Sequence, residues 1–213
     1  MIGEQVSHVV FTPDGKRALA TKFPGHKVAV LDVVGEKVTY GKYDMAVGLW
    51  PYNIDISPDG RIALTADNGN SGAADGQIDT VSVIDLEASP PRVIDKVVVG
   101  DGPEGLAISP TGQIAVALLL RGSNAAKSAF FYNPNGSVVA MRIDGRKVTK
   151  TNEIVVGGLP EGAVFSDDGR YLYVGNFITQ DISILRVEGD RIVDTGKRIP
   201  AGGHPASMRG RTR

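Results

Sequence analysis

The segment SDDGRYLYVGN, residues 166–176, joins a tight turn to a short strand. Aspartate favours the first corner of such a turn, and Gly169 accepts a positive φ. In Tyr171–Val174 successive side chains alternate between two faces, and Gly175-Asn176 ends the strand. The same kind of turn occurs at Thr12-Pro13-Asp14-Gly15, Ser57-Pro58-Asp59-Gly60 and Ser109-Pro110-Thr111-Gly112. The turns therefore recur at intervals of roughly 50 residues, which indicates an internal repeat.

A second landmark, Gly-x-x-Pro, keeps step with these turns. It occurs at Gly48-Leu49-Trp50-Pro51, Gly100-Asp101-Gly102-Pro103, Gly157-Gly158-Leu159-Pro160 and Gly202-Gly203-His204-Pro205. Two independent landmarks in one phase are not expected by chance, so the chain divides into repeated units.

Each unit has the pattern of four strands. In the second unit we expect strands at residues 53–57, 61–66, 80–85 and 93–99. Alternation is clearest in the third strand, where Thr80–Asp85 matches Lys27–Asp32 and Asp181–Arg186. Four short antiparallel strands per unit are typical of a β-propeller blade, which buries both faces only by stacking on its neighbours. The sequence predicts an all-β propeller with about four four-stranded blades, at residues 6–47, 51–99, 103–156 and 160–201.

Aspartates recur where the third strand of a unit should end, at Asp32, Asp85 and Asp144. We interpret them as turn caps that accept backbone hydrogen bonds. Asn68 and Asn176, at the ends of second strands, are expected to act in the same way.

At these residues the chain resembles the YVTN-repeat, lactonase-like β-propellers, a bacterial group with WD-like repeats named for the tetrapeptide Tyr173-Val174-Gly175-Asn176. The resemblance covers essentially the whole chain. It weakens in the first unit, which reads Thr21-Lys22-Phe23-Pro24, and in the third, which reads Leu118-Leu119-Leu120-Arg121 before an insertion at 125–136. It implies a propeller of six or seven blades, related to quinoprotein amine dehydrogenase propellers.

The four units fall short of that number. Residues 205–208 look like the first strand of a further blade, and the chain starts inside its own first strand at Val6-Ser7-His8. We expect the chain to be the C-terminal part of a longer propeller, with a closed four-bladed ring as the alternative. An open arc would leave apolar blade flanks exposed, through which the chain could form homo-oligomers.

Composition excludes several classes of function. The net charge of −1 gives no electrostatic reason to expect nucleic acid, and no apolar run is long enough to span a membrane. There is no cysteine for a thiolate site or haem attachment, and the three histidines lie far apart, so we predict no metal and no cofactor. Residues 67–72 lack the ligands of a calcium loop. The N-terminus has no signal-peptide pattern, and a full-length form that carries one would be periplasmic or extracellular.

The residues just after each Gly-x-x-Pro enter the innermost strand of a blade and should meet at one mouth of the central channel. This phase gives eight candidate ligand-binding residues: His8, Trp50, Tyr52, Asn53, Glu104, Glu161, His204 and Ser207. Convergent polar and aromatic groups at one opening form a candidate site for a small molecule.

Two functions fit this site. The first is noncatalytic binding of a partner protein or small ligand at the channel face, because the chain has no nucleophile elbow, P-loop or HExxH motif.

The second is implied by the resemblance: a lactone hydrolase of the 6-phosphogluconolactonase kind. Glu104 or Glu161 would then activate water, and His204 or Arg121 would stabilise the oxyanion. The histidines that such hydrolases tend to have after the channel-entry proline are absent here. A third possibility, a quinoprotein amine dehydrogenase-like subunit, would need its chemistry supplied by another chain.

Overall fold

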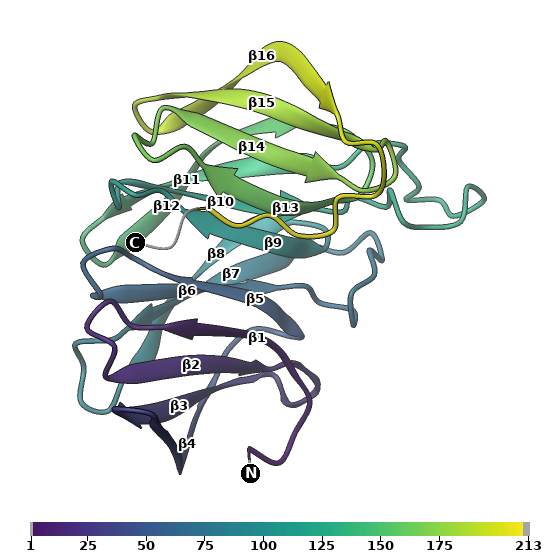
Figure 1. Ribbon diagram of the computed structural model, residues 1–213. Coiled ribbons are helices and arrows are strands. Elements are labelled where there is room, and N and C mark those ends of the chain that lie inside the picture. The colour runs from purple at the N-terminus through teal and green to yellow at the C-terminus, as the bar shows by residue number, and fades with distance from the viewer. Residues whose placement is uncertain (1, 211–213) are drawn as a thin grey trace.

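The computed structural model describes residues 2–210, which are almost entirely strands and turns. The strands form four four-stranded antiparallel sheets, each built from strands that follow one another in the chain. Figure 1 shows the sheets stacked as blades, from the purple N-terminal sheet to the yellow C-terminal one. The fold is therefore the all-β, propeller-like fold that the sequence predicts.

The blades are defined by their strands. The first contains β1 (Val6–Phe11), β2 (Arg17–Lys22), β3 (Lys27–Val34) and β4 (Lys37–Ala46), with a 3-10 turn, η1 (Phe23–Gly25). The second contains β5 (Pro51–Ile56), β6 (Ile62–Asp67), β7 (Asp79–Asp85) and β8 (Arg92–Gly100). The third contains β9 (Pro103–Ile108), β10 (Ile114–Leu119), β11 (Ser137–Asp144) and β12 (Lys147–Val155). The fourth contains β13 (Pro160–Phe165), β14 (Tyr171–Asn176), β15 (Asp181–Glu188) and β16 (Arg191–Pro200).

The repeated turn joins the first two strands of every blade with one geometry. In blade 2 the N–H of Gly60 donates to the carbonyl of Ser57 at 2.8 Å, and the Ser57 hydroxyl donates to Asp59 at 2.6 Å. Gly60 has a φ of 73°, where a β-carbon would be strained. This explains why Ser or Thr, then Asp, and then Gly stand at fixed places in the repeat, with Thr111 in the place of the Asp in blade 3, where its hydroxyl lies 2.9 Å from that of Ser109.

Neighbouring blades share hydrophobic cores. Ala63 belongs to a cluster with Leu19 of blade 1, whereas Leu64, the next residue of β6, belongs to a cluster with Leu106 of blade 3. A third cluster joins blades 3 and 4. Because both faces of an inner blade are covered, the second strands β6 and β10 are buried along their whole length. Each fully buried leucine stabilises the stack by about 1.5–3 kcal/mol.

The first three Gly-x-x-Pro segments are the connections between blades, and the fourth, at 202–205, follows the last strand of blade 4. Trp50 precedes its proline with a φ of 52°, in the left-handed region that favours glycine. Two backbone hydrogen bonds hold this connection, from Asn68 N–H to the Trp50 carbonyl and from Gly69 N–H to the Leu49 carbonyl, both at 3.0 Å. Each such connection delivers a proline to the start of the next innermost strand. Strands β1, β5, β9 and β13 therefore lie side by side at the centre of the arc (Figure 1).

The last residue of each second strand occupies one equivalent position. It is filled by four different residues, Lys22, Asp67, Leu119 and Asn176. This register corrects the sequence alignment by one residue in blade 2, because Asp67 rather than Asn68 stands where Asn176 stands in blade 4.

Residues 205–208 were predicted to be a strand and belong to none. A Cβ atom on Gly162 would lie 2.8 Å from the backbone N of Met208, and one on Gly175 would lie 3.1 Å from the Cβ of Pro205. The segment therefore follows the inner part of blade 4, and Figure 1 shows its yellow trace beside β13. It lacks strand hydrogen bonds because, within residues 2–210, no further strand lies beside it to complete a ladder.

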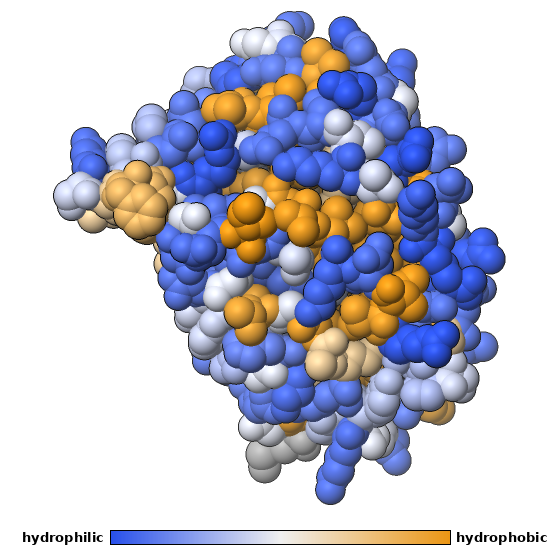
Figure 2. Space-filling view, turned by 180° about the vertical axis from the view of Figure 1, so that it is seen from behind, coloured by the Kyte–Doolittle hydropathy of each residue, from blue (hydrophilic) through white to orange (hydrophobic). Residues whose placement is uncertain are grey.

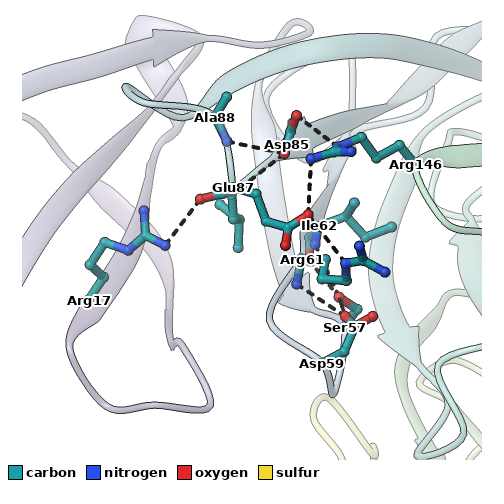
Figure 3. Close-up of polar contacts among 10 residues, drawn as sticks. Arg17, Ser57, Asp59, Arg61, Ile62, Asp85, Glu87, Ala88 and Arg146 are labelled. Atoms are coloured by element: carbon teal, nitrogen blue, oxygen red, sulfur yellow. Dashed lines mark hydrogen bonds and ion pairs between the residues drawn. The ribbon is translucent and has the colours of Figure 1, made fainter.

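The aspartate caps are confirmed at Asp85. Its Oδ1 accepts the N–H groups of Glu87 at 3.0 Å and Ala88 at 3.3 Å. Its Oδ2 pairs with Nε of Arg146 from blade 3 at 2.8 Å, so the cap also ties two blades together (Figure 3). Asp32 does not end a strand, because β3 continues to Val34.

Seen from behind, the surface is mainly hydrophilic, crossed by hydrophobic bands (Figure 2). Among residues 2–210 there is no helix with the length and apolar character needed to span a bilayer. The insertion at 125–136 projects from blade 3 (Figure 1).

Candidate functional site

The innermost strands surround a cavity of about 720 Å³. Residues from β1, β5, β9 and β13 line it, together with residues 207–210 of the C-terminal segment. Four of the predicted site residues reach this cavity: His8, Asn53, Glu161 and Ser207. The phase of the Gly-x-x-Pro landmark thus brings residues from three blades and the C-terminal segment to one place.

Glu104 is almost completely buried near this group, with 6% of its surface exposed. Its Oε2 atom has no hydrogen-bond partner in the described part of the chain. Burial, and then the charge of Glu161, raises the pKa of Glu104 to about 7, against a smaller opposing effect of Tyr52. Near neutral pH both protonation states are populated, which is the property of a general acid or base.

Glu161 enters the cavity from β13, beside β9. Burial raises the pKa of Glu161 as well. No lysine or arginine within residues 2–210 acts on either glutamate. The two carboxyl groups therefore form a pair without a counterion.

Tyr52 reaches this pair from β5. A Cβ atom on Gly72 would lie 3.5 Å from Cε2 of Tyr52 and 3.6 Å from Oε1 of Glu104, so these residues meet at one point. Burial, followed by the charges of Glu104 and Glu161, raises the pKa of Tyr52 and keeps its phenol protonated. Tyr52 is thus a hydrogen-bond donor beside two carboxyl groups.

Three charged residues of the cavity were not predicted from the sequence: Asp55, Asp167 and Arg209. Asp55 accepts the N–H groups of Ile108 and Ile56, each at 2.8 Å. It follows Asn53 by two residues on β5, so strand alternation could have found it. Burial, then the charge of Arg209, lowers the pKa of His8 and leaves that imidazole neutral at pH 7.

Three predicted site residues are engaged outside the cavity. The backbone N–H of Trp50 donates to Nδ1 of His26 at 3.0 Å, and the centroids of the Trp50 and Phe23 rings lie 5.5 Å apart. His204 stacks on Phe177 with ring centroids 4.6 Å apart, and its Nδ1 lies 2.8 Å from the Phe177 carbonyl oxygen. Arg121 faces Glu153, with Nε 3.9 Å from Oε1. The structure does not bring His204 or Arg121 to the glutamate pair.

A second group of carboxylates gathers Asp75 from the β6–β7 loop, Asp79 from the start of β7 and Asp101 from the connection between blades 2 and 3. Oxygen atoms of Asp75, Asp79 and Asp101 lie within 4.8 Å of one another, a spacing at which they could hold a cation. Burial, with the charges of Asp75 and Asp101, raises the pKa of Asp79 to about 6, against the opposing N–H of Gly102. Sequence spacing gave no sign of this cluster, because Asp101 comes from the connection to the next blade.

The segment at 67–72 is held by its own hydrogen bonds. Oδ1 of Asn68 accepts the N–H of Gly72 at 2.6 Å. Asp67 accepts the hydroxyls of Thr65, Thr80 and Ser82 at 2.7, 3.0 and 2.6 Å. The Asp67 carboxylate and the Asn68 side-chain oxygen are therefore used within the fold, whereas Nδ2 of Asn68 is buried without a partner among the described residues.

Comparison with solved structures shows what the fold is similar to. One similar structure is a provisionally named 6-phosphogluconolactonase from Bacteroides fragilis, with 20% identity over 95% of this chain and 56% of that chain, at a TM-score of 0.77. Another is the periplasmic gluconolactonase of Pseudomonas aeruginosa, with 19% identity over 94% of this chain and 55% of that chain, at a TM-score of 0.72. A third is the hydrazine synthase of Kuenenia stuttgartiensis, with 19% identity over 95% of this chain and 76% of that chain, at a TM-score of 0.58.

The fold and these likenesses define the class as a propeller-like all-β protein that shares its architecture with lactonases. No family model matches the chain, so the YVTN-repeat resemblance is not confirmed, and no curated protein matches it either. The chain spans just over half the length of the two lactonase structures. At these identities the likeness establishes the fold alone.

Proposed function

We propose that this chain provides the catalytic centre of a lactone hydrolase, with Glu161 as general base and Glu104 as general acid. The observation that carries the proposal is the buried, unpartnered Oε2 of Glu104, held without a counterion beside a second carboxyl group. A buried carboxyl group of this kind is costly for stability and is typical of sites that transfer protons.

The chemistry follows from the two environments. Glu161 lines the cavity and, when ionised, accepts a proton from a water molecule that attacks the lactone carbonyl. Glu104, with a pKa near 7, donates a proton to the ring oxygen as the acyl bond breaks. The phenol of Tyr52, which stays protonated, takes over the oxyanion-stabilising role that the sequence assigned to His204 or Arg121.

The names of the similar structures favour this function over the noncatalytic one, since two of those discussed above are lactonases. The fold by itself decides nothing, because hydrazine synthase has a similar one.

The noncatalytic alternative is that the same cavity binds a small molecule, or that the channel face binds a partner protein. It is supported by the positions of His204 and Arg121, which leave the predicted catalytic set incomplete. Association of two copies through the blade flanks belongs to the same alternative.

The deciding experiment is hydrolysis of gluconolactone by the purified chain, corrected for the spontaneous reaction. We expect Glu104→Gln and Glu161→Gln each to lower kcat about 10²–10⁴-fold, the usual contribution of a general acid or base. The matched control is Glu36→Gln, since Glu36 lies exposed in the turn between β3 and β4. Binding of the lactone without hydrolysis would instead establish the noncatalytic alternative.

A further inference from the structure

Two buried side-chain atoms have no hydrogen-bond partner among residues 2–210, Nδ2 of Asn68 and Oε2 of Glu104. Asn68 is completely buried, and Glu104 is almost so. The amide Nδ2 can only donate a hydrogen bond, whereas a carboxylate oxygen accepts one. Each unpaired atom lowers the stability of the fold. A single partner that accepts from the first atom and donates to the second would satisfy both.

Gly72, in the loop between β6 and β7, brings the two side chains together. Its N–H donates to Oδ1 of Asn68 at 2.6 Å, and a Cβ atom on Gly72 would lie 3.6 Å from Oε1 of Glu104. The N–H of Asn70 also donates to Oδ1 of Asn68, at 3.3 Å. Because two backbone donors face Oδ1, the orientation of the Asn68 amide is fixed, and Nδ2 is the end that needs an acceptor.

The side chain of Asn68 is directed toward blade 3. Asn68 directly follows β6, and side chains alternate between the two faces of a strand. Ala66 of β6 packs in one core cluster with Leu106 of β9. Asn68 stands two residues after Ala66 and therefore faces the same way, toward the strand that carries Glu104.

Glu104 is directed toward blade 2 by a bulge in β9. The register of β9 with β10 shifts at this residue, because two consecutive residues of β10 pair with Pro103 and Gly105, on either side of it. A bulge of this kind re-aims a side chain. The Glu104 carboxyl group therefore meets Gly72 of blade 2, where the Asn68 amide is bound.

We propose that Asn68 is a positioning residue for Glu104: its Nδ2 binds one buried water molecule, which donates in turn to Oε2 of the carboxylate. Water suits this place because it accepts one hydrogen bond and donates another, and buried water molecules typically bond to polar groups that have no other partner. The bridge holds the carboxyl group against the loop at 68–78. Its role in catalysis rests on the proposed hydrolase function, in which Glu104 is the acid.

The bridge acts on the carboxyl group together with two other side chains. Within residues 2–210, Glu161 from β13 and Tyr52 from β5 are the titratable groups that act on Glu104. Burial, and then the charge of Glu161, raise the pKa of Glu104 to about 7, and Tyr52 opposes that rise. A hydrogen bond to the ionised carboxylate favours the ionised form. Asn68 therefore acts in the same direction as Tyr52, and its loss should raise the pKa of Glu104.

The test is the pKa of Glu104, measured by carbon-13 NMR of the glutamate carboxyl groups and assigned with Glu104→Gln. We expect Asn68→Leu to raise this pKa, because the hydrogen bond to the carboxylate is lost. If Asn68 merely anchors the loop, its loss admits water to Glu104, and the pKa falls toward its usual value of 4.5. A lower or unchanged pKa in Asn68→Leu would overturn the inference.

Asn124 gives the matched comparison, because it holds the same loop from blade 3. Its Nδ2 donates to the Gly72 carbonyl at 3.2 Å. Asn124→Leu should therefore loosen the cover of Glu104 and lower its pKa, the opposite of Asn68→Leu. Asn70→Leu, at an exposed position of the loop, should leave the pKa unchanged. Shifts in one direction for Asn68→Leu and Asn124→Leu would contradict the bridge.

A second measurement needs neither a variant nor hydrolysis. A crystal structure of the wild-type chain should show a water oxygen within about 3.2 Å of both Nδ2 of Asn68 and Oε2 of Glu104. A different partner for either atom would overturn the bridge. If the lactone is hydrolysed, the descending limb of kcat/KM should also move to higher pH in Asn68→Leu. If it is not, the hydrolase function fails, and the pKa of Glu104 and the water position still decide the bridge.

Discussion

Gly105 packs against the backbone of Glu161, and a Cβ atom on Gly105 would lie 2.5 Å from the Glu161 carbonyl oxygen. The same Cβ atom would also lie 2.5 Å from Cδ1 of Leu118. Innermost strands β9 and β13 approach closely at this point because a hydrogen atom replaces a side chain. The glutamate pair depends on that approach, since Glu104 is the neighbour of Gly105 in the chain.

We therefore expect Gly105→Ala to separate the two strands and loosen the glutamate pair. Overpacking of this kind costs about 1–3 kcal/mol, which urea denaturation would measure as a lower midpoint. Hydrolysis should fall together with stability. Gly41→Ala is the control, because nothing lies within 4 Å of a Cβ atom there and its φ is not positive. Equal midpoints for the two variants would show that the close approach is not required.

The pH dependence of hydrolysis should report the glutamate pair. Glu161 must be ionised to act as base, so kcat/KM rises with pH as that carboxyl loses its proton. Glu104 must be protonated to act as acid, and its pKa is about 7, so kcat/KM falls again as pH rises above that value. In Glu104→Gln the descending limb should disappear from the residual rate. A descending limb that persists in this variant would assign it to another group.

Lys22, the last residue of β2, is held by hydrogen bonds and ion pairs on blade 1, and its replacement tests how much they stabilise the fold. Its Nζ lies 2.7 Å from Asp44, 3.1 Å from Glu4 and 3.2 Å from the Tyr40 hydroxyl, and the side chain is almost fully covered. Burial opposes the charge of Lys22, but these hydrogen bonds outweigh it and raise the pKa of the ammonium group. Lys22→Met should lower the free energy of unfolding by about 2 kcal/mol, because it removes the nearer cation of Asp44 and leaves only Lys27, with its Nζ 3.9 Å away.

The double variant Lys22→Met/Asp44→Asn should recover part of that loss, since Leu119 shows that an aliphatic side chain fits the equivalent position in blade 3. Lys37→Met, at an exposed position of β4, is the control and should change little. An additive double variant would show that Lys22 and Asp44 do not stabilise each other.

The repeat was predictable because turn chemistry and strand alternation are local. The four turns, the connections and the strands of blade 2 follow from residues adjacent in the chain, and the observed bounds differ by at most two residues. The prediction of a strand at 205–208 was wrong. A β-strand forms only where an adjacent strand accepts and donates its backbone hydrogen bonds, and a local sequence pattern does not show whether such a strand is present. The one-residue error at Asp67 and Asn68 has the same origin, since only the pairing with β5 fixes the register.

The site residues were predictable only where the Gly-x-x-Pro segment, or the equivalent place in the first unit, showed where an innermost strand begins. Asn53 and Ser207 reach the cavity from the second position after the Gly-x-x-Pro proline, Glu161 reaches it from the first, and His8 reaches it from the innermost strand of blade 1. His204 shares the landmark too, yet its ring stacks on Phe177 of blade 4, a contact with a residue outside the repeat phase. Strand alternation does not encode how segments far apart in the chain meet. It therefore could not predict the place of Arg209 in the cavity, or the cluster of Asp75, Asp79 and Asp101.

Asp67 in blade 2 and Asn176 in blade 4 occupy the same position, at the end of the second strand. Exchanging the carboxyl and amide groups at these two residues tests how a buried charge affects stability. Burial raises the pKa of Asp67 to about 6, although hydrogen bonds from Ser82, Thr65 and Thr80 oppose the shift. The native state therefore keeps a proton that the unfolded chain, with a pKa near 3.8, releases. The contribution of this group to the free energy of unfolding should fall by about 2 kcal/mol as pH rises from 4 to 6.

Asp67→Asn should remove that part of the pH dependence and raise stability at neutral pH. Asn176 shows that an amide fits, since its Nδ2 donates to Ser183 at 2.9 Å and Ser183 is the counterpart of Ser82. Asn176→Asp is the reciprocal variant, and it should lose stability at neutral pH because Asp181 lies 2.9 Å from the present amide. Urea denaturation at several pH values between 4 and 7 measures both. Identical pH profiles for Asp67→Asn and the wild-type chain would mean that Asp67 is ionised in the native state across this range.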